Sequence, residues 1–307
     1  MRNAFAEEIT QLARQDSRVV LLSGDIGNKL FDEFKAVDER RFYNCGVAEA
    51  NMIGVAAGMA LSGLRPVVYT ITPFTTTRCF EQIRVDVCYH KAPVVIVGTG
   101  SGLSYAELGP THHSLEDMAI LRTLPGMRVI APCDREELRL SLRAALHEES
   151  PVYIRIGKKG EPDIHSKSPD FKIGRAIVVR EGSDVLLLSA GTVMPEVLEA
   201  AELLNAKGIS AQVASFHTIK PLDVAYLAAA STRVKLVATI EEHGLIGGLG
   251  SAVAEWRASA GSAAPLLCFG TPDEFMHEVG SQKYARAKYG LTPDNIAARI
   301  LAALGKE

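Results

Sequence analysis

The chain has 307 residues, of which 47% are hydrophobic and 22% charged, and its formal net charge is -3. Because one hydrophobic core rarely serves more than about 250–300 residues, this length predicts two domains of a soluble globular protein. The weak net charge and the absence of any block of like charges argue against nucleic acid or a membrane surface as a partner.

The first half of the chain alternates helical and strand patterns. An amphipathic helix is predicted over Ala4–Ala13, and Glu7 and Glu8 stand where a signal peptide needs apolar residues. Further strands are predicted at 18–23, 66–71, 93–98, 128–131 and 152–156, and helices at 48–61, 77–90 and 135–147. This order predicts a parallel sheet with helices on both faces. Since no apolar run approaches the roughly 20 residues of a membrane span, we expect a cytoplasmic protein.

A polar segment with two prolines, GKKGEPDIHSKSPDFK at 157–172, interrupts this alternation. We therefore expect a first domain at 1–160, a linker at 161–172 and a second domain at 173–307. Strands at 176–179, 185–189, 211–215 and 236–240 and helices at 194–204, 225–230 and 251–259 follow. The predicted fold class is α/β, with two domains that each contain a parallel sheet. Near the end, Gly247, Gly248 and Gly250 either cradle a phosphate or, more commonly for such clusters, allow tight packing at a strand-to-helix turn.

Three motifs in the first half carry the chemistry: GVAEANMIGVAAGMALSG at 46–63, TITPFTTTRCFEQIRVDV at 70–87 and SYAELGPTHHSLED at 104–117. Together with EEHGLIGGLGSAVAEW in the second half, they resemble the C-terminal part of transketolases, above all the split-gene kind whose catalytic unit is divided between two polypeptides. The resemblance covers essentially the whole chain. It implies a pyrimidine-binding domain, a transketolase C-terminal domain and thiamine diphosphate as the cofactor.

The resemblance assigns cofactor roles to several residues. Glu49 corresponds to the acid that bonds a ring nitrogen of the aminopyrimidine and favours its imino tautomer, although an acid in the first turn of a helix can also serve the helix dipole alone. Phe74 would stack on the ring, unless it is ordinary core packing. Arg78 would pack along the ring or reach a phosphate, and its alternative is a solvated helix start. Asp25 would contact the cofactor or a subunit interface.

The resemblance also assigns substrate roles. His112 corresponds to the histidine near the reacting carbon, and an imidazole suits proton transfer there; His113 assists it or structures the loop. Arg155 corresponds to an arginine that binds the substrate anion, or is an ordinary arginine at a strand end. Leu108 stands where most transketolases have an aspartate that reads a donor hydroxyl, so a different sugar is expected. No metal ligand set surrounds the two histidines, and none is expected in this chain.

The chain lacks the Gly-Asp-Gly motif with a downstream Asn that holds Mg²⁺ and the diphosphate in this enzyme class; its nearest string is Gly-Asp-Ile around Asp25. We therefore expect an N-terminal-type transketolase subunit to hold both groups, and a heterotetramer of two such pairs. The expected reaction transfers a two-carbon ketol unit from a ketose phosphate, or a related phosphate- or sulfonate-bearing ketose, to an aldose. The alternatives are a subunit that decarboxylates 2-oxo acids, like a dehydrogenase beta subunit or deoxyxylulose phosphate synthase, and a non-catalytic stabilising subunit.

Overall fold

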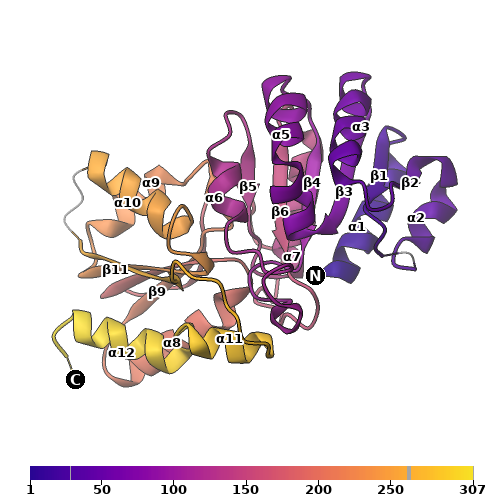
Figure 1. Ribbon diagram of the computed structural model, residues 1–307. Helices are drawn as coiled ribbons and strands as arrows, with labels where there is room; N and C mark the ends of the chain where they lie inside the picture. Colours follow the sequence, from indigo (N-terminus) through magenta and orange to yellow (C-terminus); the bar gives the residue numbers. More distant parts are fainter. Residues whose placement is uncertain (28, 261–263, 307) are drawn as a thin grey trace.

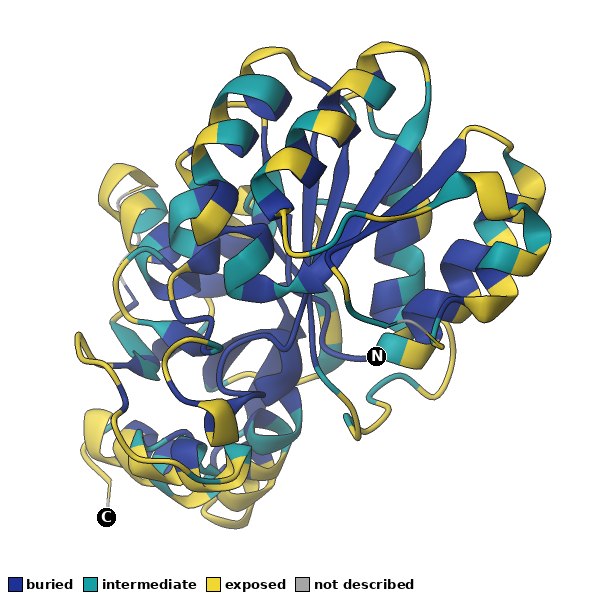
Figure 2. Cartoon of the chain, turned by 45° about the vertical axis from the view of Figure 1, so that its right-hand side comes forward, coloured by how far each residue is buried: buried dark blue, intermediate teal, exposed yellow. Residues whose placement is uncertain are grey.

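The structure is a computed structural model that describes residues 1–27, 29–260 and 264–306. It contains two mostly parallel sheets with helices on their faces, and this confirms the predicted α/β fold class (Figure 1). The central strands of both sheets are buried, and the outer faces of the helices are exposed (Figure 2). Within the described residues, no helix combines the length and apolar character needed to cross a membrane.

The first sheet has seven strands in the order β10-β5-β6-β4-β3-β1-β2, and only β10 runs antiparallel to its neighbour. Its central strands are rich in β-branched residues and are buried on both faces, as a covered parallel sheet requires. The strands are β1 Val19–Ser23, β2 Phe42–Asn44, β3 Arg65–Ile71, β4 Val95–Thr99, β5 Arg128–Ile130, β6 Val152–Ile156 and β10 Thr218–Lys220.

Helices cover both faces of this sheet. One face packs against α1 (Arg2–Gln15), α2 (Asp32–Val37) and α7 (Arg135–His147). The other packs against α3 (Glu49–Leu61), the π-helix η3 (Ile83–Tyr89) and α6 (Asp117–Arg122). Short elements complete the domain: α4 Thr72–Thr75, α5 Phe80–Gln82 and the 3₁₀ turns η1 Glu39–Arg41, η2 Thr77–Cys79 and η4 Ala106–Leu108.

The second sheet has the order β12-β11-β8-β9-β7, with β7 antiparallel at one edge. Helices α8 and α12 pack on one face, and α9 and α10 lie on the other (Figure 1). The elements are β7 Ile177–Arg180, β8 Val185–Ala190, η5 Gly191–Val193, α8 Met194–Ala206, β9 Ala211–Ser215, α9 Val224–Ser231, β11 Leu236–Gly244, α10 Leu249–Ala260, β12 Leu266–Thr271, α11 Gln282–Lys288 and α12 Pro293–Ala303.

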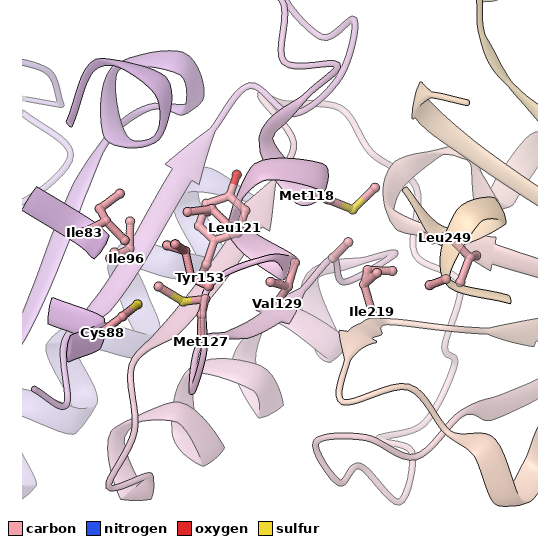
Figure 3. Close-up of a cluster of buried hydrophobic side chains, with 14 of the residues drawn as sticks. Ile83, Cys88, Ile96, Met118, Leu121, Met127, Val129, Tyr153, Ile219 and Leu249 are labelled. Carbon is pink, nitrogen blue, oxygen red and sulfur yellow. The ribbon is translucent and has the colours of Figure 1, made fainter. Parts of the chain in front are cut away.

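The two domains share a sheet edge and a core. Strand β10 belongs to the second half of the sequence but pairs with β5 of the first domain, and His217 O accepts a hydrogen bond from Ala131 N at 2.6 Å. One buried cluster includes Met118 and Val129 from the first domain and Ile219 and Leu249 from the second (Figure 3). The segment predicted as a linker, 161–172, contains no helix or strand. Residues 161–172 thus connect the two domains without regular structure, and the domains also contact each other through the β5–β10 pairing and the shared core.

Candidate active site

The residues singled out from the sequence follow parallel strands of the first sheet. Glu49 comes after β2, Phe74 and Arg78 come after β3, and His112 comes in the loop after β4. The carboxyl ends of parallel strands meet at one edge of a sheet, and ligands of α/β proteins bind outside that edge. The topology therefore brings three separate motifs to one place.

Glu49 is the first residue of α3, and its side chain is only 2% exposed. The preceding turn depends on Gly46, whose φ of +65° is accessible to glycine without strain. Its N–H donates to Asn44 Oδ1 at 3.0 Å, and Asn44 Nδ2 donates to Asp25 Oδ1 at 3.0 Å. Asp25 is exposed and supports this turn in the structure; its expected contact with a cofactor or a subunit stays a prediction.

The segment after β3 is not the continuous helix expected over 77–90, but a succession of short α, 3₁₀ and π turns. The hydroxyls of Thr75 and Thr76 both donate to Thr72 O, at 3.0 and 2.8 Å, and the Thr77 hydroxyl donates to Pro73 O at 2.8 Å. Such side-chain bonds to the backbone compete with regular helix geometry. Phe74 lies in α4 and Arg78 in η2, so both side chains are presented by these short turns and not by a regular helix.

Arg78 joins Glu49 to Phe74. Its Nη1 donates to both carboxylate oxygens of Glu49, at 3.1 and 3.0 Å, and its guanidinium carbon lies 4.2 Å from the centre of the Phe74 ring. The ring of Phe74 in turn meets His112 edge to face, with 5.3 Å between ring centres. The structure thus brings together an acid, a cation, an aromatic ring and an imidazole.

The loop after β4 presents His112. Thr111 Oγ1 lies 2.9 Å from His112 Nδ1, and Tyr105 lies 6.0 Å away between ring centres. Burial lowers the pKa of His112 below its ordinary value, so the imidazole is neutral at pH 7. With Nδ1 engaged by a hydroxyl, Nε2 is the nitrogen that can exchange a proton with a ligand.

The other two residues predicted in this loop differ in exposure. His113 is buried, burial lowers its pKa, and its Nε2 has no hydrogen-bond partner among the described residues. Leu108 is 48% exposed at the end of the short turn η4. His113 is thus enclosed by the protein, whereas Leu108 presents an apolar side chain to solvent, and the substrate roles of both stay predictions.

Arg155 lies where a strand-end clamp for a substrate anion was expected, but it points into the protein. Its side chain is 2% exposed, its Nε donates to Asp117 Oδ2 at 2.8 Å, and its Nη2 donates to Ser114 O at 2.6 Å and Glu242 O at 2.9 Å. Burial disfavours its charge, yet Asp117 leaves the pKa of Arg155 raised. These bonds favour a structural role between the domains. The predicted contact of Arg155 with a substrate anion has no support in this geometry.

Glu242, which the sequence did not single out, connects the second domain to the loop after β4. Its carboxylate accepts hydrogen bonds from Leu103 N at 2.6 Å and from Gln282 Nε2 at 2.9 and 3.1 Å, and it also pairs with Arg286. Arg286 extends this network to Glu196 at 2.5 Å. The available signal was the run Glu-Glu-His at the end of an apolar strand, because buried acids require partners.

The glycine cluster before α10 packs tightly and is not an open cradle. Leu249 N and Gly250 N donate to the two carboxylate oxygens of Glu241, at 2.7 and 2.8 Å. A Cβ at Gly248 would lie 2.2 Å from Glu241 Oε2, so only glycine fits there. A protein carboxylate already occupies the N–H groups that a phosphate would need, which supports the packing interpretation.

One group of metal-ligand types occurs in the described part of the chain, away from His112 and His113. The side chains of Cys133, Glu137 and His165 approach within 4.8 Å of one another. Glu137 already accepts a hydrogen bond from Cys133 N at 2.8 Å and interacts with His165 Nε2 at 3.0 Å. The trio therefore forms a satisfied network between the start of α7 and the predicted linker.

Comparisons with known proteins agree with this architecture. An α/β chain with an acid, an aromatic ring and a histidine gathered at the carboxyl edge of a parallel sheet has the form of an enzyme subunit. The chain belongs to the transketolase family: residues 1–161 match the transketolase pyrimidine binding domain, and residues 174–296 match the transketolase C-terminal domain.

Its relatives include proteins named as transketolase subunits. It is 34% identical over 302 residues to an apulose-4-phosphate transketolase subunit of Phocaeicola vulgatus, covering 98% of this chain and 96% of that one. It is 37% identical over 297 residues to the 6-deoxy-6-sulfo-D-fructose transketolase subunit SqwH of a Clostridium species, covering 96% and 92%. A solved structure described as a split gene transketolase, inactive beta4 tetramer, superposes with a TM-score of 0.90 at 36% identity, covering 99% and 97%.

A longer relative matches over part of its length. The chain is 37% identical over 314 residues to 1-deoxy-D-xylulose-5-phosphate synthase of Thermomicrobium roseum, a match that covers 99% of this chain but only 48% of that protein. The region shared with such full-length enzymes is thus about half of them.

Proposed function

We propose that the chain is one subunit of a transketolase that moves a two-carbon ketol unit from an anionic ketose to an aldose, and that it is active only with a partner subunit. The observation that carries this proposal is the cluster of Glu49, Phe74 and His112 at the carboxyl edge of the first sheet. It combines a buried acceptor, an aromatic face and a neutral imidazole.

Family membership implies dependence on thiamine diphosphate, and the residues present fit one end of that molecule. A buried carboxylate beside an aromatic face suits a flat ring that carries N–H donors. The chain contains no Gly-Asp-Gly motif. The diphosphate and Mg²⁺, which prefers oxygen ligands, are therefore assigned to the partner. We further propose a heterotetramer of two such pairs.

Bound thiamine diphosphate supplies the nucleophilic carbon and the electron sink of the reaction. Glu49 accepts a hydrogen bond at the ring edge and thereby favours one tautomer, and Phe74 orients the ring plane. His112 takes and returns a proton at Nε2 while Thr111 fixes Nδ1. Because burial lowers the pKa of His112, the neutral form predominates at pH 7, so Nε2 can take a proton first and return it from the imidazolium.

The proposed substrate is an anionic ketose that differs from the usual pentose and hexose phosphates. Leu108 cannot accept the hydrogen bond that an aspartate would accept from a donor hydroxyl. The names of two relatives, which specify a sugar phosphate and a sulfonated sugar, are compatible with either a phosphate or a sulfonate as the anion.

The test reconstitutes the chain with a partner that carries Gly-Asp-Gly and a downstream Asn. Glu49→Gln should abolish ketol transfer from a ketose phosphate or sulfonate to an aldose, while the complex keeps its mass by light scattering. Glu199→Gln, at an exposed position of α8, is the matched control and should retain full activity. Undiminished turnover of the Glu49 variant would contradict the assignment, and a mass that fits a single pair would contradict the heterotetramer.

A second candidate is decarboxylation of a 2-oxo acid, which the match to a deoxyxylulose phosphate synthase favours. The same complex incubated with pyruvate and an aldose phosphate would then release carbon dioxide, whereas ketol transfer releases none. If the chain is a non-catalytic subunit, the complex would still bind thiamine diphosphate. Its turnover of ketoses and of 2-oxo acids would then be the same for the wild type and for Glu49→Gln.

A further inference from the structure

Arg78 contacts both groups that a flat ring would need, the Glu49 carboxylate and the Phe74 ring. Both carboxylate oxygens of Glu49 accept a hydrogen bond from Arg78 Nη1, and the carbon of the same guanidinium lies 4.2 Å from the centre of the Phe74 ring. The edge of His112 approaches the same Phe74 ring, at 5.3 Å between centres. A second flat group could therefore not stack on Phe74 and face Glu49 unless the guanidinium moved.

The guanidinium resembles the edge of an aminopyrimidine in chemical terms. Both are planar and delocalised, both present N–H groups in one plane, and both stack on aromatic rings. Glu49 is 2% exposed, whereas the Arg78 side chain is 44% exposed. The acid is thus fixed at the start of a helix, while the arginine reaches it from the open side of the site and can leave toward solvent.

We infer that in the free chain the Arg78 guanidinium occupies the place of the cofactor's aminopyrimidine ring, between Glu49 and Phe74, and that binding of the cofactor displaces it. This inference rests on the proposed function of the cluster and adds a competition to it. In the free chain the arginine neutralises the buried acid, whose exposure as an unpaired charge would be costly. When the ring enters with the partner, it replaces the arginine on both Glu49 and Phe74.

The first measurement uses the chain alone and tests the pairing. Arg78→Met and Glu49→Gln should each lower Tm, and the double variant should lose clearly less than the sum of the two, since each single change leaves the other group without its partner. Arg14→Met is the matched control, because Arg14 is 47% exposed and lies 3.9 Å from its acid; combined with Glu49→Gln it should be additive. Additive losses for Arg78 and Glu49 would overturn the pairing.

The second measurement tests displacement in the reconstituted complex by calorimetric titration with thiamine diphosphate and Mg²⁺. Arg78→Met should lower Kd by about fivefold or more, because the ring no longer competes with the guanidinium. Arg78→Lys, which keeps the charge but loses the flat stacking group, should lie between the methionine variant and the wild type. Arg14→Met should leave Kd unchanged.

The outcomes separate this inference from the proposed function. If the wild-type complex binds the cofactor and Arg78→Met binds it equally or more weakly, then Arg78 is not a competitor and the inference alone fails. If the wild-type complex binds no cofactor, the proposed function and the inference fail together.

Discussion

Removing the carboxylate of Asp117 should destabilise the chain more than any substitution at its surface. Asp117 Oδ2 accepts hydrogen bonds from Arg155 Nε at 2.8 Å and from the Tyr153 hydroxyl at 2.6 Å, and the side chains of Asp117 and Arg155 are each 2% exposed. Breaking a buried ion pair from one side costs about 3–5 kcal/mol, and an unpaired buried hydroxyl costs roughly 1–3 kcal/mol. The two costs are not additive, so we expect Asp117→Ala to lower the free energy of unfolding by about 4 kcal/mol or more.

Urea unfolding followed by circular dichroism and by the fluorescence of Trp256 would measure this loss. Trp256 is the single tryptophan of the chain and lies in α10 of the second domain, so it reports on the far side of the interface from Asp117. Because Arg155 also donates to Glu242 O, both probes should shift together. The double variant Asp117→Leu, Arg155→Met should recover part of the loss, since it leaves no unpaired charge but still removes the partners of the Tyr153 hydroxyl and of Ser114 O and Glu242 O. A loss below about 1 kcal/mol for Asp117→Ala would refute the reasoning.

Three further predictions concern His165 in the predicted linker and the glycines Gly248 and Gly58. Burial opposes charging of His165, but Glu137 leaves its pKa raised, so the stabilising contribution of this proton is complete below about pH 6.5 and is lost as the pH rises through the folded pKa. His165→Ala should therefore speed tryptic cleavage of residues 157–172 at pH 6 and have a smaller effect at pH 9; an effect that grows with pH would contradict this. Gly248→Ala should lower Tm strongly because its Cβ meets Glu241. Gly58→Ala, in the exposed last turn of α3 where an added Cβ meets nothing within 4 Å, should stabilise the chain by roughly 0.5–1 kcal/mol, as thermal unfolding would show.

Much of the fold could be predicted from local signals. The helix at 135–147 and the strand at 152–156 have the predicted bounds, because the first begins at a capping residue, Asp134, whose side chain accepts from Glu137 N, and the second is a short β-branched run. The three motifs of the candidate site also reach one edge of the sheet, as the order of strands and helices implies. The bounds of these elements depend on residues close together in sequence, and the meeting of the motifs depends on the order of the elements along the chain.

The misses depend on contacts that a local pattern does not reveal. Residues 77–89 form successive 3₁₀, α and π turns instead of the one helix expected, directly after Thr75 and Thr76, whose hydroxyls bond to Thr72 O. Strand β10 has three residues and exists because β5, far earlier in the chain, offers an unpaired edge. Arg155 on β6 forms an ion pair with Asp117 at the start of α6, and no pattern around it distinguishes an outward from an inward side chain. Burial of charge is decided by tertiary packing.

The return of β10 to the first sheet has a consequence during synthesis. The first 160 residues leave the ribosome before β10 exists, so the edge of β5 stays unpaired until more than 50 further residues have been made. Unpaired strand edges promote association between nascent chains. A chaperone that shields this edge, or slow release of the first half, would suit such a topology, and a fragment ending at residue 160 should aggregate where the whole chain does not.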